Sequence, residues 1–540
     1  MNNYNYFGVM LDMSRNAVMK VSEVKHLMDI VKKMGYNAVE LYTEDTYEIE
    51  GEPFFGYMRG RYTADEIKEM DAYANSIGIE LIPCVQTLAH FTTLVRHSTY
   101  SSIVDTADIL LIDEEKTYEL IDKIFKTLSQ NFTSRKVNIG MDEAHMVGLG
   151  KYLDKHGYQN RYEILLRHLN RVVEIAKKYG FSVHMWSDMF FRLALNGEYY
   201  KEGGVDLPDE VVKAIPKEVE IVYWNYYSTT RQRYDDMLKS HKKVSDNVWF
   251  AGGASGWYGF APFNQHTLDT MSCAMQSVKD HKIKNVLITL WGDDGKECSF
   301  YALLPSLYAV RQFADGNFDM DDISSKFKQL FGLDFYDFMK LDLPNKTPRK
   351  IFDHTGEKEV VNNGCKSLLY ADPFMGAMDK MVEQEGIVDY KAIADEIKNA
   401  GKNMGEFSYL FDNLSALCEV LKYKMDLGVR TRKAYKDNNK TALSQIVNDY
   451  DNTFVALEKF HKEFSKLWHK ENKGFGFEVQ DIRLGGLMQR LKTCKQRLID
   501  FIDGKIDRIE ELDEEVLCEN PDAYFLSNRH WRISTFNTLV

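Results

Sequence analysis

Short apolar runs alternate with longer stretches of helical periodicity over roughly residues 1–315. The apolar runs are rich in Val, Ile, Phe and Tyr, which is typical of buried strands. The eight predicted strands are Phe7–Leu11, Ala38–Tyr42, Glu80–Val85, Lys136–Gly140, Ser182–Trp186, Glu220–Trp224, Val248–Gly252 and Val286–Leu290. The predicted helices are Val21–Met34, Ala64–Ile77, Glu115–Leu128, Arg161–Tyr179, Thr230–Lys243, Thr267–His281 and Phe300–Phe313.

The alternation of eight strands with helices predicts a closed parallel barrel. Gly35, Gly78 and Gly180 each stand between a predicted helix and the next strand, where glycine readily adopts the left-handed conformation that ends helices. Eight such units fit a (β/α)8 barrel. The alternative is a doubly wound open sheet, but neither a GxGxxG nor a Walker loop follows the first strand, which removes its usual ligand.

Beyond about residue 320 the strand pattern fades and helical periodicity takes over. Long amphipathic stretches cover Asp395–Lys436, Thr441–Lys470 and Asp481–Ile506. We therefore predict an α/β protein with a (β/α)8 catalytic barrel over residues 1–320 and a mostly α-helical C-terminal domain over residues 321–540.

The composition indicates a soluble globular protein. Hydrophobic residues make up 44% and charged residues 28% of the chain, and the net charge of -13 argues against nucleic acid or an anionic membrane as partner. The N-terminus lacks the basic and apolar segments of a signal peptide, and no apolar run reaches the ~18 residues of a membrane span. The 7 Cys lack zinc spacing. We expect reduced thiols, a cytoplasmic location and no cofactor.

The most informative motif is the acidic pair Asp142-Glu143 in the run Val137-Asn138-Ile139-Gly140-Met141-Asp142-Glu143. At the carboxyl end of a barrel strand, such a pair faces the ligand site. Neighbours on a regular strand point to opposite faces, so both can serve one site only if the pleat is already broken. The alternative is an Asp-Glu pair that begins the next helix.

Polar and aromatic side chains gather at the other predicted strand ends. They are Asp12 and Arg15; Glu44 and Asp45; Gln86 and His90; His145; Trp186 and Asp188; Trp224, Asn225, Tyr226 and Tyr227; Trp257 and Tyr258; and Trp291, Asp293 and Asp294. Four of the seven Trp end the last four strands. Indole faces pack on pyranose C–H faces while carboxylates and Arg bind hydroxyls, so this rim suits a sugar. A metal site is the alternative, but His90, His145 and His184 lack ligand spacing, and we predict none.

These residues resemble the motifs of glycoside hydrolase family 20, the β-N-acetylhexosaminidases. Asp12-Met13-Ser14-Arg15 is similar to the family's Asp-x-x-Arg, and Thr43-Glu44-Asp45 lies where it shows Thr-Asp. Thr87-Leu88-Ala89-His90 resembles its Pro-Gly-His. Asn138-Ile139-Gly140-Met141-Asp142-Glu143 is similar to its His-x-Gly-Gly-Asp-Glu, with Asn138 and Met141 as departures. Trp186, Trp224 and Trp291 match the family's aromatic walls, and Asp293 stands where Glu is usual.

The resemblance implies an exo-acting enzyme that removes terminal β-GlcNAc or β-GalNAc by retaining, substrate-assisted catalysis. It assigns Glu143 as acid and base, Asp142 to the 2-acetamido N–H, and Tyr227 to the acetamido oxygen, with Tyr258 as the alternative for that last role. Together with the aromatic rim at the strand ends, it predicts sugar binding by Arg15, Glu44, His90, Trp186, Trp224, Trp257, Tyr258, Trp291 and Asp293.

Two other functions stay open at this point. One is a retaining glycosidase whose nucleophile is Glu44, Asp188 or Asp293. The other is a non-catalytic sugar-binding barrel. The expected partner is a glycan with a terminal β-linked N-acetylhexosamine. We expect neither nucleic acid nor membrane as partner, and we allow for a homodimer.

Overall fold

The computed structural model describes residues 4–345, 364–517 and 531–532. The chain forms two compact units. The barrel unit comprises residues 1–254, 269–291 and 307–318, and the helical unit comprises residues 255–268, 292–306 and 319–540. The expected boundary after residue 320 stays a prediction.

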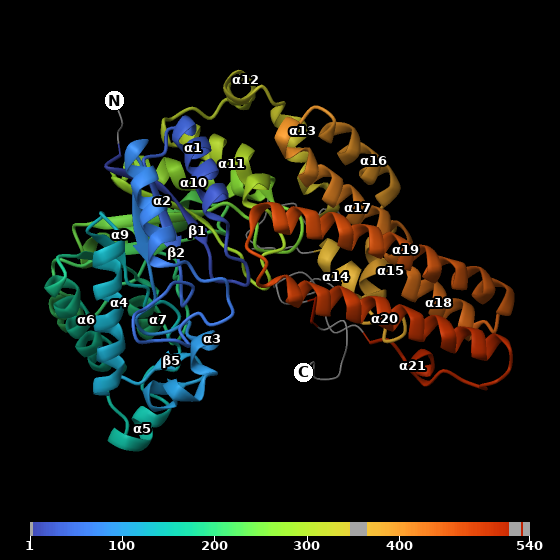
Figure 1. The fold of residues 1–540 in the computed structure, drawn as a ribbon, viewed down its shortest axis with the longest axis horizontal. Coiled ribbons are helices and arrows are strands. Elements are labelled where there is room, and N and C mark those ends of the chain that lie inside the picture. The colour runs from blue at the N-terminus through green and yellow to red at the C-terminus, as the bar shows by residue number, and fades with distance from the viewer. Residues whose placement is uncertain (1–3, 346–363, 518–530, 533–540) are drawn as a thin grey trace. The chain divides into compact units, whose positions relative to one another are not determined.

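Eight parallel strands close into a barrel, as the alternation predicts (Figure 1). They are β1 (Tyr6–Asp12), β2 (Ala38–Tyr42), β3 (Glu80–Cys84), β6 (Lys136–Asn138), β7 (Ser182–Trp186), β8 (Glu220–Trp224), β9 (Val248–Gly253) and β10 (Asn285–Leu290). Each of these strands pairs with the barrel strand before it and the barrel strand after it along the chain, and β1 pairs with β10 to close the barrel. All seven residues of β1 are buried, as expected for a strand covered on both faces.

The register brings the strand ends to one rim. Asp12, Tyr42, Cys84, Asn138 and His184 are successive partners from β1 round to β7. The segments that follow these residues therefore leave the barrel at the same edge, where the ligand site of this architecture lies.

The helices between strands are amphipathic, and three of them pack on neighbouring strands: α2 on β3, α6 on β7 and α9 on β8. The helices of this part are α1 (Val21–Met34), α2 (Ala64–Ser76), α4 (Glu115–Asn131), α6 (Arg161–Lys178), α9 (Arg231–Val244), α10 (Asn264–Asp280), and the continuous pair η2 (Phe300–Leu303) and α11 (Leu304–Ala314). Thr63 and Glu66 form a reciprocal capping box at the start of α2, which satisfies two otherwise unpaired N–H groups.

Several short elements lie in the connections between the barrel strands and were not predicted. They are α3 (Thr92–Val95), η1 (Ser98–Ile103), the antiparallel pair β4 (Val104–Thr106) and β5 (Ile109–Leu110), α5 (Lys151–His156), α7 (Asp188–Ala194) and α8 (Asp209–Ala214). Elements of two to seven residues give too few positions for a periodic pattern to emerge.

The helical unit confirms the predicted α-helical C-terminal domain. Its later helices are α12 (Met320–Phe331), α13 (Phe335–Met339), η3 (Lys340–Asn345), α14 (Gly364–Tyr370), α15 (Asp379–Glu385), α16 (Tyr390–Gly401), η4 (Gly405–Phe407), α17 (Ser408–Lys424), α18 (Leu427–Lys436), α19 (Lys440–Glu471), α20 (Phe477–Ile502) and α21 (Glu510–Asp513). Helix α17 packs on α16 and α19, and α19 packs on α20. The predicted stretch Asp395–Lys436 is broken between helices, with Gly405 in the left-handed region at φ 53°.

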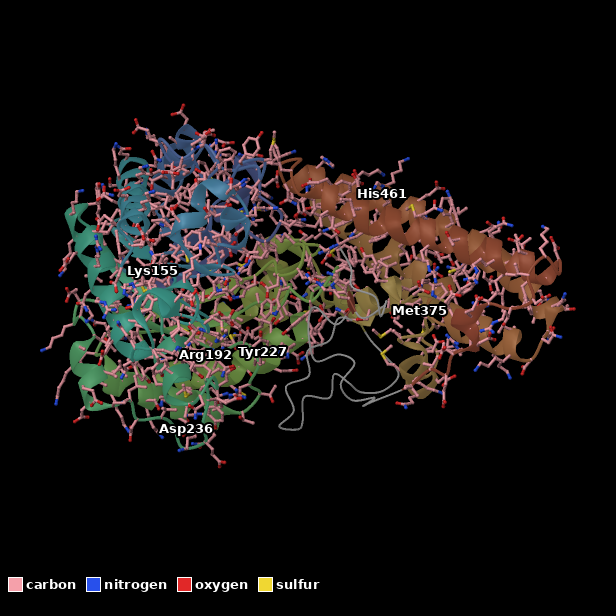
Figure 2. All side chains as sticks on the ribbon, turned by 90° about the horizontal axis from the view of Figure 1, so that it is seen from below. Lys155, Arg192, Tyr227, Asp236, Met375 and His461 are labelled. Carbon is pink, nitrogen blue, oxygen red and sulfur yellow. The ribbon has the colours of Figure 1, made fainter. Side chains whose placement is uncertain are left out.

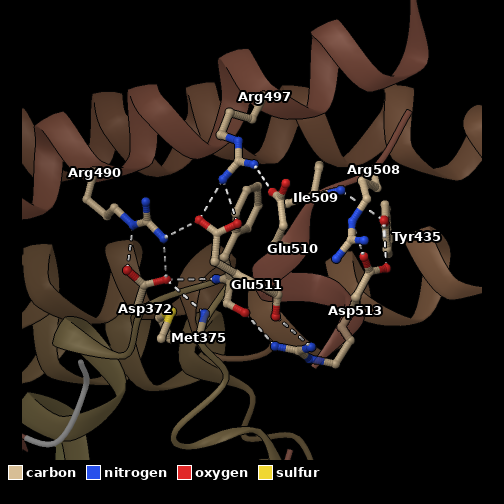
Figure 3. Close-up of polar contacts among 12 residues, drawn as sticks. Asp372, Met375, Tyr435, Arg490, Arg497, Arg508, Ile509, Glu510, Glu511 and Asp513 are labelled. Atoms are coloured by element: carbon tan, nitrogen blue, oxygen red, sulfur yellow. Dashed lines mark hydrogen bonds and ion pairs between the residues drawn. The ribbon is translucent and has the colours of Figure 1, made fainter. Parts of the chain in front are cut away.

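Ion pairs fasten the end of the helical unit (Figure 3). Arg490 on α20 donates to Asp372 at 2.6 Å and lies 3.9 Å from Glu511. Arg497, two turns further along α20, binds the same Glu511 carboxylate. These contacts hold α21 against α20. Within residues 4–345, 364–517 and 531–532, no helix has the length and apolar character to cross a bilayer.

Candidate active site

The strand β6 loses its pleat just before the acidic pair. The strand ends at Asn138, two residues earlier than predicted, because Gly140 and Met141 take φ of 72° and 69°. Glu143 also has a positive φ, 52°. A Cβ at residue 140 would lie 2.1 Å from Oε1 of Gln86, so only glycine fits there. The broken pleat allows Asp142 and Glu143 to face the same side.

His90 contacts both carboxylates of the pair. Its Nε2 atom lies 3.1 Å from Oδ2 of Asp142 and 3.8 Å from Oε2 of Glu143. The two acids differ in exposure, since the Asp142 side chain is 11% exposed and the Glu143 side chain 43% exposed. The structure therefore brings three predicted site residues together and leaves one of the two acids open to solvent.

Asp142 is held in its charged form. Burial alone would raise the pKa of its carboxyl group, but the close charge of His90, the amide of Gln86 and the charge of Arg15 outweigh burial and lower it. Gln86 Nε2 donates to Oδ1 at 2.8 Å. Burial lowers the pKa of His90, and the neighbouring Asp142 carboxylate more than reverses this, raising it to about 9. Asp142 and His90 thus form a buried ion pair near neutral pH.

Arg15 lies between two carboxylates and two aromatic rings. Its Nη1 atom is 3.1 Å from Asp12 and its Nε atom 3.3 Å from Glu44. Its guanidinium carbon lies 4.5 Å from the ring centre of Tyr42 and 4.7 Å from that of Trp291. The side chain is 19% exposed. Arg15 is fixed by its surroundings yet remains accessible, which suits a hydroxyl-binding group.

A continuous chain of hydrogen bonds connects Arg15 to the acidic pair. The Tyr42 hydroxyl donates to Glu44 at 3.0 Å and accepts from Gln86 at 3.1 Å. Gln86 also donates to Asp142. The chain crosses the ends of β1, β2, β3 and β6, so the predicted residues Arg15, Glu44 and Asp142 belong to one polar network.

Aromatic side chains form two groups at the rim. In the first, Trp291 packs edge-on against Tyr42 at 4.9 Å and lies 6.1 Å from Trp186. In the second, Trp224 stacks on Tyr226 at 5.2 Å with an interplanar angle of 16°, and Tyr199 lies 4.9 Å from Trp224. Trp186, Tyr42, Tyr226 and Trp291 are buried, whereas Trp224 and Tyr199 are half-buried. The accessible apolar surface for a pyranose therefore comes mainly from the second group.

The two tyrosines after β8 differ in environment. Tyr226 is buried, and burial raises the pKa of its hydroxyl well above its ordinary value. Tyr227 is half-buried, and its ring meets that of Tyr226 edge-on at 5.8 Å. Figure 2 labels Tyr227 in the barrel unit. The more accessible Tyr227 stays the predicted partner of an acetamido oxygen.

Asp188 and Arg192, both on α7, adjoin Glu143. Oδ2 of Asp188 accepts the backbone N–H of Glu143 at 3.1 Å and the Nε–H of Arg192 at 3.1 Å. Nη2 of Arg192 lies 3.9 Å from Oε1 of Glu143. Burial and the charge of Asp142 raise the pKa of Asp188 to about 7. Sequence reasoning did not find Arg192. The signal was its spacing of four residues from Asp188, which places both on one helix face.

Three predicted residues fall in the helical unit. Trp257 and Tyr258 are buried there, and Asp293 is half-buried. Next to Asp293, Asp294 and Glu297 share the buried Lys366 ammonium, at 3.3 Å and 2.8 Å. The sugar-binding roles of Trp257, Tyr258 and Asp293 stay predictions. Among the residues that the structure describes, no group of three or more His, Cys, Asp and Glu could hold a metal ion.

Two family models match the chain. The catalytic-domain model of glycosyl hydrolase family 20 matches residues 4–244, which carry the network from Arg15 to Glu143. The model of the Glycoside Hydrolase 20C C-terminal domain matches residues 336–526. The chain belongs to glycoside hydrolase family 20. The resemblance seen in the sequence is confirmed, and the helical region, which no motif of that resemblance covered, proves to have a family model of its own.

Curated relatives of this family 20 glycoside hydrolase carry the name hexosaminidase D. The protein from Homo sapiens is 24% identical over 347 residues, which are 59% of this chain and 68% of that protein. The protein from Bos taurus is 22% identical over 296 residues, 51% of this chain and 82% of that protein.

Among solved structures, a GH20 exo-β-N-acetylglucosaminidase from Vibrio harveyi, in complex with N-acetylglucosamine, is 16% identical with a TM-score of 0.47. That likeness covers 63% of this chain and 58% of the other, so the chain spans less than two thirds of that protein.

Proposed function

We propose that this family 20 glycoside hydrolase is an exo-acting β-N-acetylhexosaminidase that removes terminal β-GlcNAc or β-GalNAc by substrate-assisted, retaining catalysis. One observation carries the proposal. Adjacent acids share one histidine, yet Asp142 is buried and charge-paired while Glu143 is 43% exposed on its side chain. Such a pair suits two different tasks on one sugar, a fixed charge and a mobile proton.

In the first step the acetamido oxygen of the substrate attacks the anomeric carbon, and the bond to the leaving oxygen breaks. Glu143 gives its proton to that leaving oxygen. The Asp142 carboxylate accepts the acetamido N–H and lies opposite the positive charge that develops on the oxazolinium ring. Tyr227 would donate to the acetamido oxygen and fix its direction of attack.

In the second step a water molecule attacks the anomeric carbon and the bond to the acetamido oxygen breaks. Glu143 takes the proton of that water and returns to its starting form. The product is a sugar with retained β configuration. No enzyme nucleophile is needed ~5 Å from the acid, which is why two adjacent acids suffice.

The sugar itself would rest on the network around Arg15. Arg15 and Glu44 would bind vicinal hydroxyls, and Trp291 beside them would pack a ring face. His90 would hold Asp142 in place. Trp186 and Trp224 would close the sides of the pocket.

The contacts of two acids speak against their use as an enzyme nucleophile. The Asp188 side chain is fully buried and its Oδ2 atom already accepts two hydrogen bonds. Glu44 is occupied by Arg15 and the Tyr42 hydroxyl. The enclosure of Asp188 and the engagement of Glu44 with Arg15 and Tyr42 therefore favour a nucleophile supplied by the substrate.

A substrate panel tests the proposal. Initial rates would be compared for the 4-nitrophenyl β-glycosides of GlcNAc, GalNAc and glucose, with and without a GlcNAc-derived thiazoline. We expect hydrolysis of the acetamido sugars only, blocked by the thiazoline. Hydrolysis of the glucoside at a similar rate would favour an enzyme nucleophile, and no hydrolysis of any of the three glycosides would favour a binding protein.

A further inference from the structure

The catalytic acid proposed above sits on a backbone that needs outside support. Glu143 has φ 52°, a left-handed conformation that is unfavourable for a residue with a side chain. Two of the three residues before it, Gly140 and Met141, are also left-handed. Residues in such conformations persist only when their surroundings fix them.

A single carboxylate oxygen supplies that support. Oδ2 of Asp188 accepts the Glu143 N–H at 3.1 Å and the Arg192 Nε–H at 3.1 Å. The Asp188 side chain is 0% exposed, so the accepting oxygen itself lies away from solvent. A charge-assisted bond in such a site is stronger than one between neutral groups.

Arg192 extends the support to the side chain of the acid. Its Nη2 atom lies 3.9 Å from Oε1 of Glu143, while its Nη1 atom donates to the Gly197 carbonyl at 2.9 Å. Its guanidinium carbon lies 5.4 Å from the ring centre of Tyr199 and 5.8 Å from that of Trp224. Figure 2 labels Arg192 in the barrel unit. Contacts with Asp188 and the Gly197 carbonyl therefore fix Arg192, and its Nη2 atom lies on the side of Glu143.

We propose that Asp188 and Arg192 are a positioning pair that holds Glu143 where its proton reaches the leaving oxygen. The inference rests on the proposed function. Asp188 acts through the backbone of Glu143, and Arg192 acts through Asp188 and beside the Glu143 carboxylate. Neither residue touches the substrate in this account. The raised pKa of Asp188, to about 7, fits a carboxyl group that is buried beside Asp142 and relies on Arg192 for its charge.

The dependence of kcat/KM on the leaving group distinguishes a positioning role of Asp188 and Arg192 from a role in the stability of the fold alone. A poor leaving group needs the proton of Glu143, whereas a 2,4-dinitrophenolate departs with little help. The experiment measures kcat/KM for the 4-methylphenyl and 2,4-dinitrophenyl β-glycosides of GlcNAc. The variants are Asp188→Ala, Asp188→Asn, Arg192→Met and Arg192→Lys in the full chain.

We expect the ratio of the two kcat/KM values to shift against the poor leaving group by about tenfold or more for Asp188→Ala. Asp188→Asn keeps an acceptor oxygen for the Glu143 N–H and should shift the ratio less. Arg192→Lys keeps the charge and should shift it less than Arg192→Met. KM should stay within about twofold, because the substrate contacts are intact.

Asp105→Asn is the matched control. Asp105 is also buried and accepts backbone N–H groups of the connection after β6, from Gly148 at 3.1 Å and Tyr152 at 2.8 Å. The Asp105→Asn variant should have a lower midpoint of thermal unfolding, but its ratio of the two kcat/KM values should match that of the wild type. Equal losses on both substrates for the Asp188 and Arg192 variants would overturn the positioning role. A wild-type enzyme inactive on both glycosides would instead reject the proposed function, and the positioning role with it.

Discussion

Nε2 of His90 lies 3.1 Å from Oδ2 of Asp142, and the Asp142 side chain is only 11% exposed. The Asp142 carboxylate raises the pKa of His90 to about 9, and His90 helps to hold the pKa of Asp142 below its ordinary value. A carboxylate that stays charged throughout the neutral range suits a group opposite a cationic intermediate.

Replacing Glu143 by Gln removes the proton donor but keeps the shape of the side chain. We expect kcat/KM on a chitobiose-like glycan to fall by about 10²–10⁴-fold. The loss should be much smaller on 2,4-dinitrophenyl β-GlcNAc, and binding of GlcNAc should be retained. Steady-state kinetics and calorimetry measure these quantities. Near-normal turnover of the natural glycan would show that another group is the acid.

Replacing Asp142 by Asn removes the charge beside His90 and opposite the acetamido group. We expect kcat to fall on the order of 10²-fold for good and poor leaving groups alike, since the charge serves both steps. The pKa of His90 should fall because the carboxylate that raises it is gone, and NMR of the imidazole follows this. Wild-type kinetics in this variant would exclude the substrate-assisted scheme.

Replacing Arg15 by Lys keeps the charge but loses the planar fork between Asp12 and Glu44. We expect KM to rise roughly tenfold with a smaller effect on kcat, because ground-state and transition-state contacts to the hydroxyls are lost together. Arg167→Lys is the control, because Arg167 pairs with Asp113 and donates to Tyr152 and Gln159, outside the network of Arg15. An unchanged KM would remove Arg15 from the sugar site.

His168 makes the fold sensitive to acid. Its Nε2 atom lies 2.9 Å from the Thr87 carbonyl and its Nδ1 atom 3.1 Å from the Tyr118 hydroxyl. The carbonyl can only accept, so Nε2 carries the proton, Nδ1 accepts, and the ring is neutral. Burial lowers the pKa of His168 to about 4.

The sign of the pH effect follows from this lowered pKa. The contribution of His168 to the free energy of unfolding is complete above the ordinary pKa of 6.5 and is lost as the pH falls toward 4, by on the order of 3 kcal/mol. His241, whose pKa burial lowers to about 3, adds in the same direction. Urea unfolding at about pH 7 and about pH 5 measures the change. The His168→Gln variant should show a smaller difference in the free energy of unfolding between these two pH values. A difference equal to that of the wild type would contradict the role given to His168.

Much of the fold could be predicted because its signals are local. Each strand is a short apolar run and each long helix repeats its apolar face, so the barrel and the helical C-terminal region follow from periodicity. The gathering of Arg15, Glu44, His90 and Asp142 followed from their positions at strand ends, where the barrel collects side chains. These two rules need no knowledge of distant contacts.

The parts that sequence reasoning missed depend on contacts across the chain. The hydroxyl of Tyr42 connects Glu44 to Gln86 from inside a strand, where an aromatic residue looks like ordinary core. Asp188 looked like a candidate nucleophile because burial cannot be read from a strand end, yet its side chain is fully enclosed. Tyr199, beside Trp224, lies in an irregular connection without periodicity.

The most direct measurement of the central claim uses 4-nitrophenyl β-GlcNAc analogues whose acetamido group carries none, one, two or three fluorine atoms. Each fluorine weakens the carbonyl oxygen as a nucleophile without removing the group. If that oxygen attacks the anomeric carbon, log kcat/KM falls steadily across the series. A rate that does not depend on fluorination would contradict the account, because the bond-forming atom would then belong to the protein.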